Sequence, residues 1–206
     1  TAMSFDEYHD SRWVTWPFHL FDCCLVTDSG AAIIVTTAER AKSLKKAPVW
    51  VLGAGEGHDH NMVSQMPDYT STWARRSGPL SMQRAGITHD DLDLTMIYDS
   101  FTYTVMVTLE SLGFCGPGEA ADFVANQRTA PGGDFALNTN GGGLSYTHPG
   151  MYGSFLLVEA VRQLRGEAGD RQVKSKRDPS QNAKISIVNG TGGSLSSTGT
   201  VVLAVD

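Results

Sequence analysis

The stretch from Asn138 to Gly153 constrains the fold of this chain more than any other. Its run of consecutive glycines allows backbone conformations that other residues avoid, and it lets the backbone approach a ligand closely. Pro149 restricts the backbone of the residue before it, so His148 is held on a rigid turn. An apolar segment with helical period, residues 155–164, follows at once. A glycine loop, a fixed histidine and a helix start predict a polar site, although a tight connection with a capping histidine has the same pattern.

The composition is that of a globular protein without a nucleic-acid partner. Hydrophobic residues make up 41% of the 206 residues, and charged residues make up 18%. The net charge of −6 comes without a basic face, which argues against nucleic-acid binding. No apolar run reaches the length of a membrane span and no secretory signal is present, so we expect a cytoplasmic protein. The first residue is threonine, which suggests a piece of a longer protein.

The cysteines and histidines predict neither a disulfide framework nor a metal site. Cys23 and Cys24 are adjacent and cannot readily bridge each other, and Cys115 lies far away in the sequence. His58 and His60 have no carboxylate or histidine at helical spacing beside them, so we expect no metal. The thiols are therefore expected to be structural and to stay reduced.

Hydrophobic periodicity predicts an α/β chain. The first twenty residues carry aromatic side chains without a clean period, and we expect them to form an arm that packs on something. The segment Gly53–Gly57 ends a strand but lacks the spacing of a nucleotide-binding loop. The expected strands lie within residues 21–26, 31–36, 49–52, 89–98, 184–188 and 201–205, and the expected helices within 39–46, 71–86, 101–112 and 154–165.

The sequence Tyr98-Asp-Ser-Phe101 falls between a buried strand and the start of a helix. Sites in α/β proteins are built at the carboxyl ends of strands. Helix N–H groups beside Tyr98 would favour its phenolate, so we expect the pKa of this phenol to be lowered.

Five motifs in order resemble the C-terminal part of thiolases, and residues 163–173 resemble the sterol-carrier-type branch most. The motifs are Asp28-Ser-Gly-Ala-Ala, Asp91-Leu-Asp-Leu, Tyr98-Asp-Ser-Phe, Gly142-Gly-Leu-Ser-Tyr-Thr-His-Pro and Asn189-Gly-Thr-Gly-Gly. The resemblance implies a thiolase fold, in which each half has a mixed five-stranded sheet with helices on both faces. Residues 1–46 would then finish the N-terminal half, and residues 47–206 would form the C-terminal domain.

Two departures from the family change the expected chemistry. Sterol-carrier-type thiolases read His-Asp-Cys-Phe, where the histidine helps to bind the thioester oxygen and the cysteine acts as acid and base. This chain has Tyr98 and Ser100 at those positions. A serine hydroxyl cannot replace a partly ionised thiol, so thiolysis is expected to be lost. His148 of the family's Gly-His-Pro motif is kept, although Thr147 replaces the glycine.

This pattern is similar to that of the thiolase-like lipid-transfer aldolases of bacterial sterol side-chain degradation. Such a resemblance implies retro-aldol cleavage of a β-hydroxyacyl-CoA to a ketone and a shorter acyl-CoA. His148 would donate to the thioester oxygen, and Tyr98 and Tyr146, expected in the same cavity, would be acid and base. Asp99 and Ser100 would support them.

The remaining expectations concern the substrate and the partners. No cofactor is expected beyond the coenzyme A that forms part of the substrate. The resemblance implies a homodimer and a small OB-fold partner with a zinc ribbon. Two alternatives stay open, a working sterol-carrier-type thiolase and a non-catalytic lipid-binding scaffold. The residues expected to contact substrate are Gly142, Gly143, Asn189, Gly190, Gly192 and Gly193.

Overall fold

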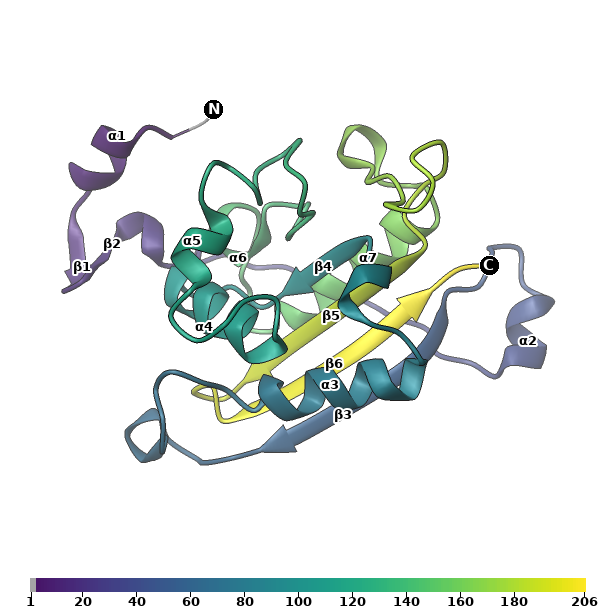
Figure 1. Ribbon diagram of the computed structural model, residues 1–206, viewed down its shortest axis with the longest axis horizontal. Coiled ribbons are helices and arrows are strands. Elements are labelled where there is room, and N and C mark those ends of the chain that lie inside the picture. The colour runs from purple at the N-terminus through teal and green to yellow at the C-terminus, as the bar shows by residue number, and fades with distance from the viewer. Residues whose placement is uncertain (1–2) are drawn as a thin grey trace.

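The centre of the protein is a mixed sheet, seen in a computed structural model that describes residues 3–206 (Figure 1). Its four strands are β3 (Trp50–His58), β4 (Leu94–Ile97), β5 (Ile185–Gly192) and β6 (Ser197–Ala204). They lie in the order β3-β6-β5-β4, with β4 parallel to β5 and the other neighbours antiparallel. β5 and β6 form a hairpin, and Gly193 takes a positive φ of 58° in the turn between them.

A fifth strand was expected, and a single β-bridge followed by a side-chain contact occupies its place beside β4. Leu137 pairs with Thr95 of β4 in a single parallel bridge. Next to it, the side-chain amide of Asn138 accepts from the Ile97 N–H at 2.8 Å and donates to the Ile97 carbonyl at 2.8 Å. A side chain therefore continues the ladder where a peptide would, and no strand is needed to satisfy this part of the edge.

Helices cover both faces of the sheet, as expected. On one face, α3 (Ala74–Ala85) and α4 (Thr102–Leu112) form a core cluster with Ile187 and Val202 of the sheet. On the other face, α7 (Gly153–Leu164) packs on Val188 and Leu203. The alternation along β5 and β6 that a pleated strand imposes thus divides the core in two. Gly86 and Gly113, both with positive φ, end α3 and α4.

The remaining elements are short. The first of them form an arm, residues 3–22, which stands out from the body beside α4 (Figure 1). The arm contains α1 (Phe5–His9), β1 (Trp13–Thr15), β2 (Phe18–His19) and a 3-10 turn at Leu20–Asp22. The other short elements are α2 (Ala38–Lys42), α5 (Ala120–Val124) and α6 (Gly142–Ser145), with 3-10 turns at Val63–Gln65, His89–Asp91 and Gly169–Arg171.

Alternating glycines in β3 bring α3 onto the sheet. The sequence placed Gly53–Gly57 at the end of a strand, but the strand runs through it to His58. A Cβ at Gly53 would lie 2.1 Å from the Ser81 carbonyl oxygen, and one at Gly55 would lie 2.6 Å from the Ser77 carbonyl oxygen. The glycines therefore serve close packing of helix on strand, a use of glycine that differs from loop formation.

The two strands expected at residues 21–26 and 31–36 are wrong. Residues 20–22 form a 3-10 turn, and Cys23 makes a single bridge with Phe101. Residues 24–37 have no regular structure. Val26, Ile34 and Val35 are among the most exposed large apolar residues of the described chain. A β-rich composition makes a strand only where a partner strand supplies a run of hydrogen bonds. Among residues 3–206 the first segment has a single bridge, and the second belongs to no sheet.

Within residues 3–206, every helix is too short or too polar to cross a bilayer. The expectation that no helix would span a membrane concerned the whole chain, and this observation covers its described part.

The glycine contact between β3 and α3 can be tested by adding one methyl group. Gly53→Ala should destabilise the protein by about 1–3 kcal/mol or more, because the added Cβ overlaps backbone atoms that cannot turn away. The matched control is Gly199→Ala on β6, where no atom lies within 4 Å of the added Cβ. Chemical denaturation should show a lower free energy of unfolding for the first variant and little change for the second. Equal values for the two would contradict the packing argument.

Candidate active site

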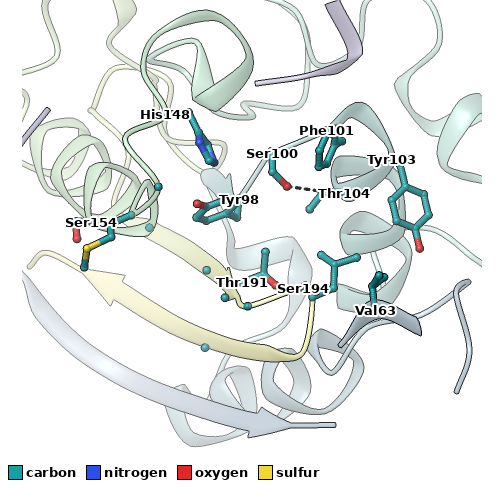
Figure 2. Close-up of a pocket in the computed structure, with 18 of the residues that line it drawn as sticks. Val63, Tyr98, Ser100, Phe101, Tyr103, Thr104, His148, Ser154, Thr191 and Ser194 are labelled. Atoms are coloured by element: carbon teal, nitrogen blue, oxygen red, sulfur yellow. Dashed lines mark hydrogen bonds between the residues drawn. The ribbon is translucent and has the colours of Figure 1, made fainter. Parts of the chain in front are cut away.

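A pocket of about 1000 Å³ opens on the α7 face of the sheet (Figure 2). Its floor is made by β5, β6 and their turn, and its walls by the start of α4, the segment from His148 into α7, and the arm. Figure 2 shows Tyr98 and His148 facing it from the strand end and from the turn, with Thr191 on the sheet below.

The lining of this pocket carries no formal charge. Among the described residues that line it there is no Asp, Glu, Lys or Arg, and the titratable side chains are His148, Tyr98 and Tyr103. Apolar side chains such as Phe18, Phe101 and Leu157 make up much of the wall. Such a pocket suits an uncharged, largely apolar group with a few polar contacts at one end.

Tyr98 lies directly after β4 and is buried, with 8% of its surface exposed. Its ring meets the imidazole of His148 edge-on, with 5.3 Å between ring centres and an angle of 89°. Burial raises the pKa of Tyr98, the backbone of Tyr152 lowers it by less, and the Cys24 thiol and Asp99 raise it further. The expected lowering of this pKa is therefore wrong, because desolvation outweighs the backbone hydrogen bond of Tyr152. The phenol is neutral at neutral pH.

His148 is held by hydroxyl groups from a distant segment. Thr27 accepts a hydrogen bond from the His148 N–H at 2.9 Å, and the Thr147 hydroxyl lies 2.8 Å from the hydroxyls of both Thr27 and Ser29. Burial lowers the pKa of His148, so its imidazole is neutral. Its Nε2 is buried and has no hydrogen-bond partner among the described residues. A neutral ring with one open nitrogen can give or take a hydrogen bond from a ligand.

Asp99 joins the end of β4 to the start of α6. Its buried carboxylate accepts from the backbone N–H groups of Gly143 at 2.7 Å and Leu144 at 3.3 Å. Burial raises the pKa of Asp99 to about 6, against the opposing effect of these N–H groups. A Cβ on Gly142 would lie 1.9 Å from an Asp99 oxygen, and one on Gly143 would lie 2.9 Å from the His148 ring.

Gly142 and Gly143 were expected to contact substrate, and the structure places them elsewhere. Neither lines the pocket, and both are buried against Asp99. Their small size brings the turn that carries His148 close to the end of β4.

The second glycine motif, residues 189–193, is divided between the two faces of the sheet. Gly190, Gly192 and Gly193 line the pocket, and their contact with a substrate stays a prediction. Asn189 does not line it, because its amide points to the opposite face and donates to the Thr200 hydroxyl at 2.7 Å. Successive residues of a strand point to opposite faces, which separates Asn189 from its neighbours.

Ser100 and Tyr146 have different positions relative to the pocket. Ser100 lines it, and its hydroxyl lies 3.1 Å from the hydroxyl of Thr104 (Figure 2). Tyr146 is half exposed, packs against Phe155 with 6.5 Å between ring centres, and is not among the lining residues. The expectation that both phenols share one cavity with His148 holds for Tyr98 alone.

Sequence reasoning missed two aromatic residues of the site. Tyr152 is fully buried, donates to the side-chain oxygen of Asn140 at 2.9 Å and stacks near His148, with 6.2 Å between ring centres. Its place at the start of a helix just after the His-Pro turn was the available signal. Phe18 enters from the arm and packs beside Phe101, with 5.8 Å between ring centres. Nothing in its local pattern indicated this position.

The described residues hold no group of three or more side chains suited to a metal ion. His60, one of the two neighbouring histidines considered for a metal, has its Nε2 3.0 Å from the Ser194 carbonyl oxygen. The three cysteines are free thiols, and burial raises the pKa of each.

Comparison with known proteins gives a consistent result. The Thiolase C-terminal domain-like family matches residues 55–205. A steroid side-chain-cleaving aldolase of Thermomonospora curvata is 35% identical over 197 residues, covering 92% of this chain and 48% of that protein. A 17-hydroxy-3-oxo-4-pregnene-20-carboxyl-CoA lyase of Mycobacterium tuberculosis is 38% identical over 171 residues, covering 80% of this chain and 43% of that protein.

A solved structure described as an Ltp2-ChsH2(DUF35) aldolase has the same fold, with a TM-score of 0.82 and 28% identity. The match covers 99% of this chain and 52% of that one. This chain spans about half the length of the relatives it matches.

The buried carboxyl of Asp99 should make stability fall as pH rises. Its pKa is about 6 in the folded protein and 3.8 ordinarily, so the folded state binds more protons between these values. The free energy of unfolding should therefore fall by up to about 3 kcal/mol as pH rises from about 4 to 7, and stay level above. The measurement is the difference between wild type and Asp99→Asn in denaturation at each pH. A difference that is flat or rises with pH would contradict the burial of an ionisable carboxyl here.

Proposed function

Because the chain belongs to the family of thiolase C-terminal domain-like proteins, we propose that it is the C-terminal part of a carbon–carbon lyase of the retro-aldolase type. The substrate would be a β-hydroxyacyl-CoA with a bulky, sterol-derived acyl group, and the products a ketone and a shorter acyl-CoA. Both relatives compared above are named for cleavage of steroid derivatives. Residues 1–46 would end the N-terminal half, and 47–206 would be the C-terminal domain.

The observation that carries the proposal is the contact between Tyr98 and His148 in an uncharged pocket. A volume of about 1000 Å³ lies at the upper end for small-molecule sites, which suits a polycyclic acyl group. The phosphates of coenzyme A call for cationic partners, and the described lining offers none. The acyl group and the reacting carbons would therefore occupy this pocket, with the nucleotide outside it.

The reaction moves one proton and breaks one carbon–carbon bond. The β-hydroxyl loses its proton, the bond between the α and β carbons breaks, and its electron pair forms the enolate of the thioester. The α carbon takes up a proton in the same step, so that enolate character develops mainly in the transition state, and ketone and shortened thioester leave with no net gain or loss of protons. Neither a nucleophile nor an oxidant is needed, and an enzyme has to stabilise the enolate and move the proton.

His148 would stabilise the enolate and Tyr98 would move the proton. In the tautomer that carries its proton on Nε2, neutral His148 can donate to the thioester oxygen from its open nitrogen. Tyr98, which is neutral, can take the hydroxyl proton while it gives its own to the α carbon. This relay avoids a free phenolate, which its raised pKa disfavours. Tyr146, half exposed and outside the lining, has no place in this assignment.

The proposal extends to partners and compartment. A homodimer and an OB-fold partner with a zinc ribbon would complete the working enzyme. A second protein, as the coarser part of this proposal, is supported by a solved relative whose description joins two names, Ltp2 and ChsH2(DUF35). No bound cofactor is proposed besides the coenzyme A of the substrate. A cytoplasmic location is supported by the three cysteines, which are free thiols.

Removing the Tyr98 hydroxyl should decide the reaction type. In the full-length protein, Tyr98→Phe should lower retro-aldol turnover by about a hundredfold or more, because it removes the proton carrier and keeps the ring. Ser100→Ala, in the same pocket, should be mild. The measurement is ketone formation from a β-hydroxyacyl-CoA without added CoA, after unchanged melting is confirmed. A nearly normal Tyr98→Phe with an inactive Ser100→Ala would favour a thiolase, and so would product that requires added CoA. No turnover by wild type would favour a scaffold.

Removing the imidazole should affect the chemical step more than binding. His148→Ala should lower kcat by about a hundredfold or more, the usual loss on deleting one oxyanion donor. The dissociation constant of an unreactive thioester analogue should change much less, since charge develops on the oxygen mainly in the transition state. Single-turnover rates and equilibrium titration measure the two effects separately. A variant with normal kcat and weakened binding would assign His148 to substrate binding alone.

A further inference from the structure

One buried carboxylate fastens the arm to the body of the protein. Asp22 is 6% exposed, and its two oxygens have different partners. Oδ2 accepts from the Tyr8 hydroxyl and from the His19 N–H, each at 2.7 Å, and both donors belong to the arm. Oδ1 accepts from the Thr102 hydroxyl at 2.7 Å, and Thr102 is the first residue of α4. This side chain thus makes a hydrogen-bonded connection between the arm and the helix that walls the pocket.

Besides Asp22, the contacts of the arm with the body include the packing of Phe18 on Phe101 and, at its end, the backbone bridge between Cys23 and Phe101. Among residues 3–22, only His19 and Asp22 are buried, and Trp13 and Trp16 are largely exposed. Inside the arm, the ring of His19 packs on Tyr8 and Trp13, with ring centres 5.0 and 3.7 Å apart. The arm is therefore a small folded unit without a core cluster of its own, and its position depends on a few directional contacts.

The same arm reaches into the pocket. Thr15 and Phe18 line it, and Phe18 packs beside Phe101. In Figure 2 Phe101 and Tyr103 lie on the side of Ser100 away from His148, so this aromatic wall is separate from the reacting groups. An apolar wall set apart from Tyr98 and His148 is suited to contact the acyl group of the substrate and not its thioester.

We propose that Asp22 is a positioning residue that sets the arm as the acyl-side wall of the pocket, and that Phe18 in this wall selects bulky apolar acyl groups. The inference rests on the proposed function, because the arm would contact the acyl group of the substrate in the same pocket. Its consequence is that loss of one hydroxyl on α4, outside the pocket chemistry, changes which substrate is preferred.

The matched pair Thr102→Val and Thr102→Ser isolates this contact in the full-length protein. Valine keeps the shape of threonine and removes the donor to Asp22, whereas serine keeps the donor. The readout is the ratio of kcat/KM for a polycyclic β-hydroxyacyl-CoA to that for a short-chain one. We expect Thr102→Val to lower this ratio about tenfold or more, mainly through KM, and Thr102→Ser to stay within about threefold of wild type.

Phe18→Ala tests the wall itself, and proteolysis tests the position of the arm. Phe18→Ala should also lower the ratio about tenfold or more, since it removes apolar contact with the bulky acyl group. Trypsin should cut after Arg12, an exposed residue of the arm, faster in Thr102→Val than in Thr102→Ser. Equal ratios for the valine and serine variants, or a Phe18→Ala ratio equal to wild type, would overturn the inference.

A binding measurement separates this inference from the proposed reaction. Titration with a polycyclic acyl-CoA that lacks the β-hydroxyl needs no turnover. Weaker binding by Thr102→Val than by Thr102→Ser would support the arm as acyl wall, even if wild type cleaves nothing and the retro-aldolase assignment falls. Cleavage by wild type with identical binding in both variants would leave the reaction standing and overturn the role of Asp22. Failure of wild type to bind the analogue would overturn it as well.

Discussion

The contact between the Asp99 carboxylate and the first N–H groups of α6 holds the candidate site together. It connects the end of β4, where Tyr98 lies, to the turn that carries His148. The contact requires Gly142 and Gly143, since a side chain at either position would meet Asp99 or the imidazole. The burial that makes this carboxylate a good anchor also raises its pKa to about 6, so the anchor comes with an energetic penalty at neutral pH. Functional sites commonly keep such destabilising groups, here because the Asp99 contact fixes the position of His148 relative to Tyr98.

The two faces of the sheet have separate tasks. On the α3 face, polar side chains contact each other, from the Asn189 amide nitrogen to Thr200 and from Thr200 to Ser77 at 2.7 Å each, whereas the Asn189 side-chain oxygen has no partner among the described residues. On the α7 face, the glycines of β5 leave space, and the imidazole of His148 has a nitrogen without a partner. The hydrogen-bonded hydroxyls of the first face therefore stabilise the fold, and the unpartnered imidazole nitrogen on the second face is available to a ligand.

The sequence predicted the elements well where a local pattern was sufficient. The helices after Ser100 and before Gly166, with the strands around the second glycine motif, follow from periodicity and from glycine stops. Prediction failed where the outcome depended on distant neighbours. The segment expected as a strand at 21–26 has a single bridge, and the one at 31–36 has no partner strand among the described residues. Phe18 lines the pocket from an arm that contacts the body through residues distant in sequence, such as Asp22 and Thr102, eighty residues apart. The pKa of Tyr98 depends on burial, which the sequence of a strand end does not report. Asn189 was expected to contact substrate because the predicted strand ended at residue 188, whereas β5 continues to Gly192. The alternation of side chains along a strand therefore was not applied to Asn189.

The amide of Asn138 also affects how this sheet can associate. At the β4 side, a one-residue bridge and a side chain occupy the hydrogen-bonding groups of Thr95 and Ile97. An incoming strand would have to displace them, and a carboxamide offers it no further backbone to pair with. Within the described chain, β3 is the other outer strand, with Val51 and Leu52 exposed beside its open edge. Any edge-to-edge pairing or misassembly of this sheet is thereby directed to one side of the molecule.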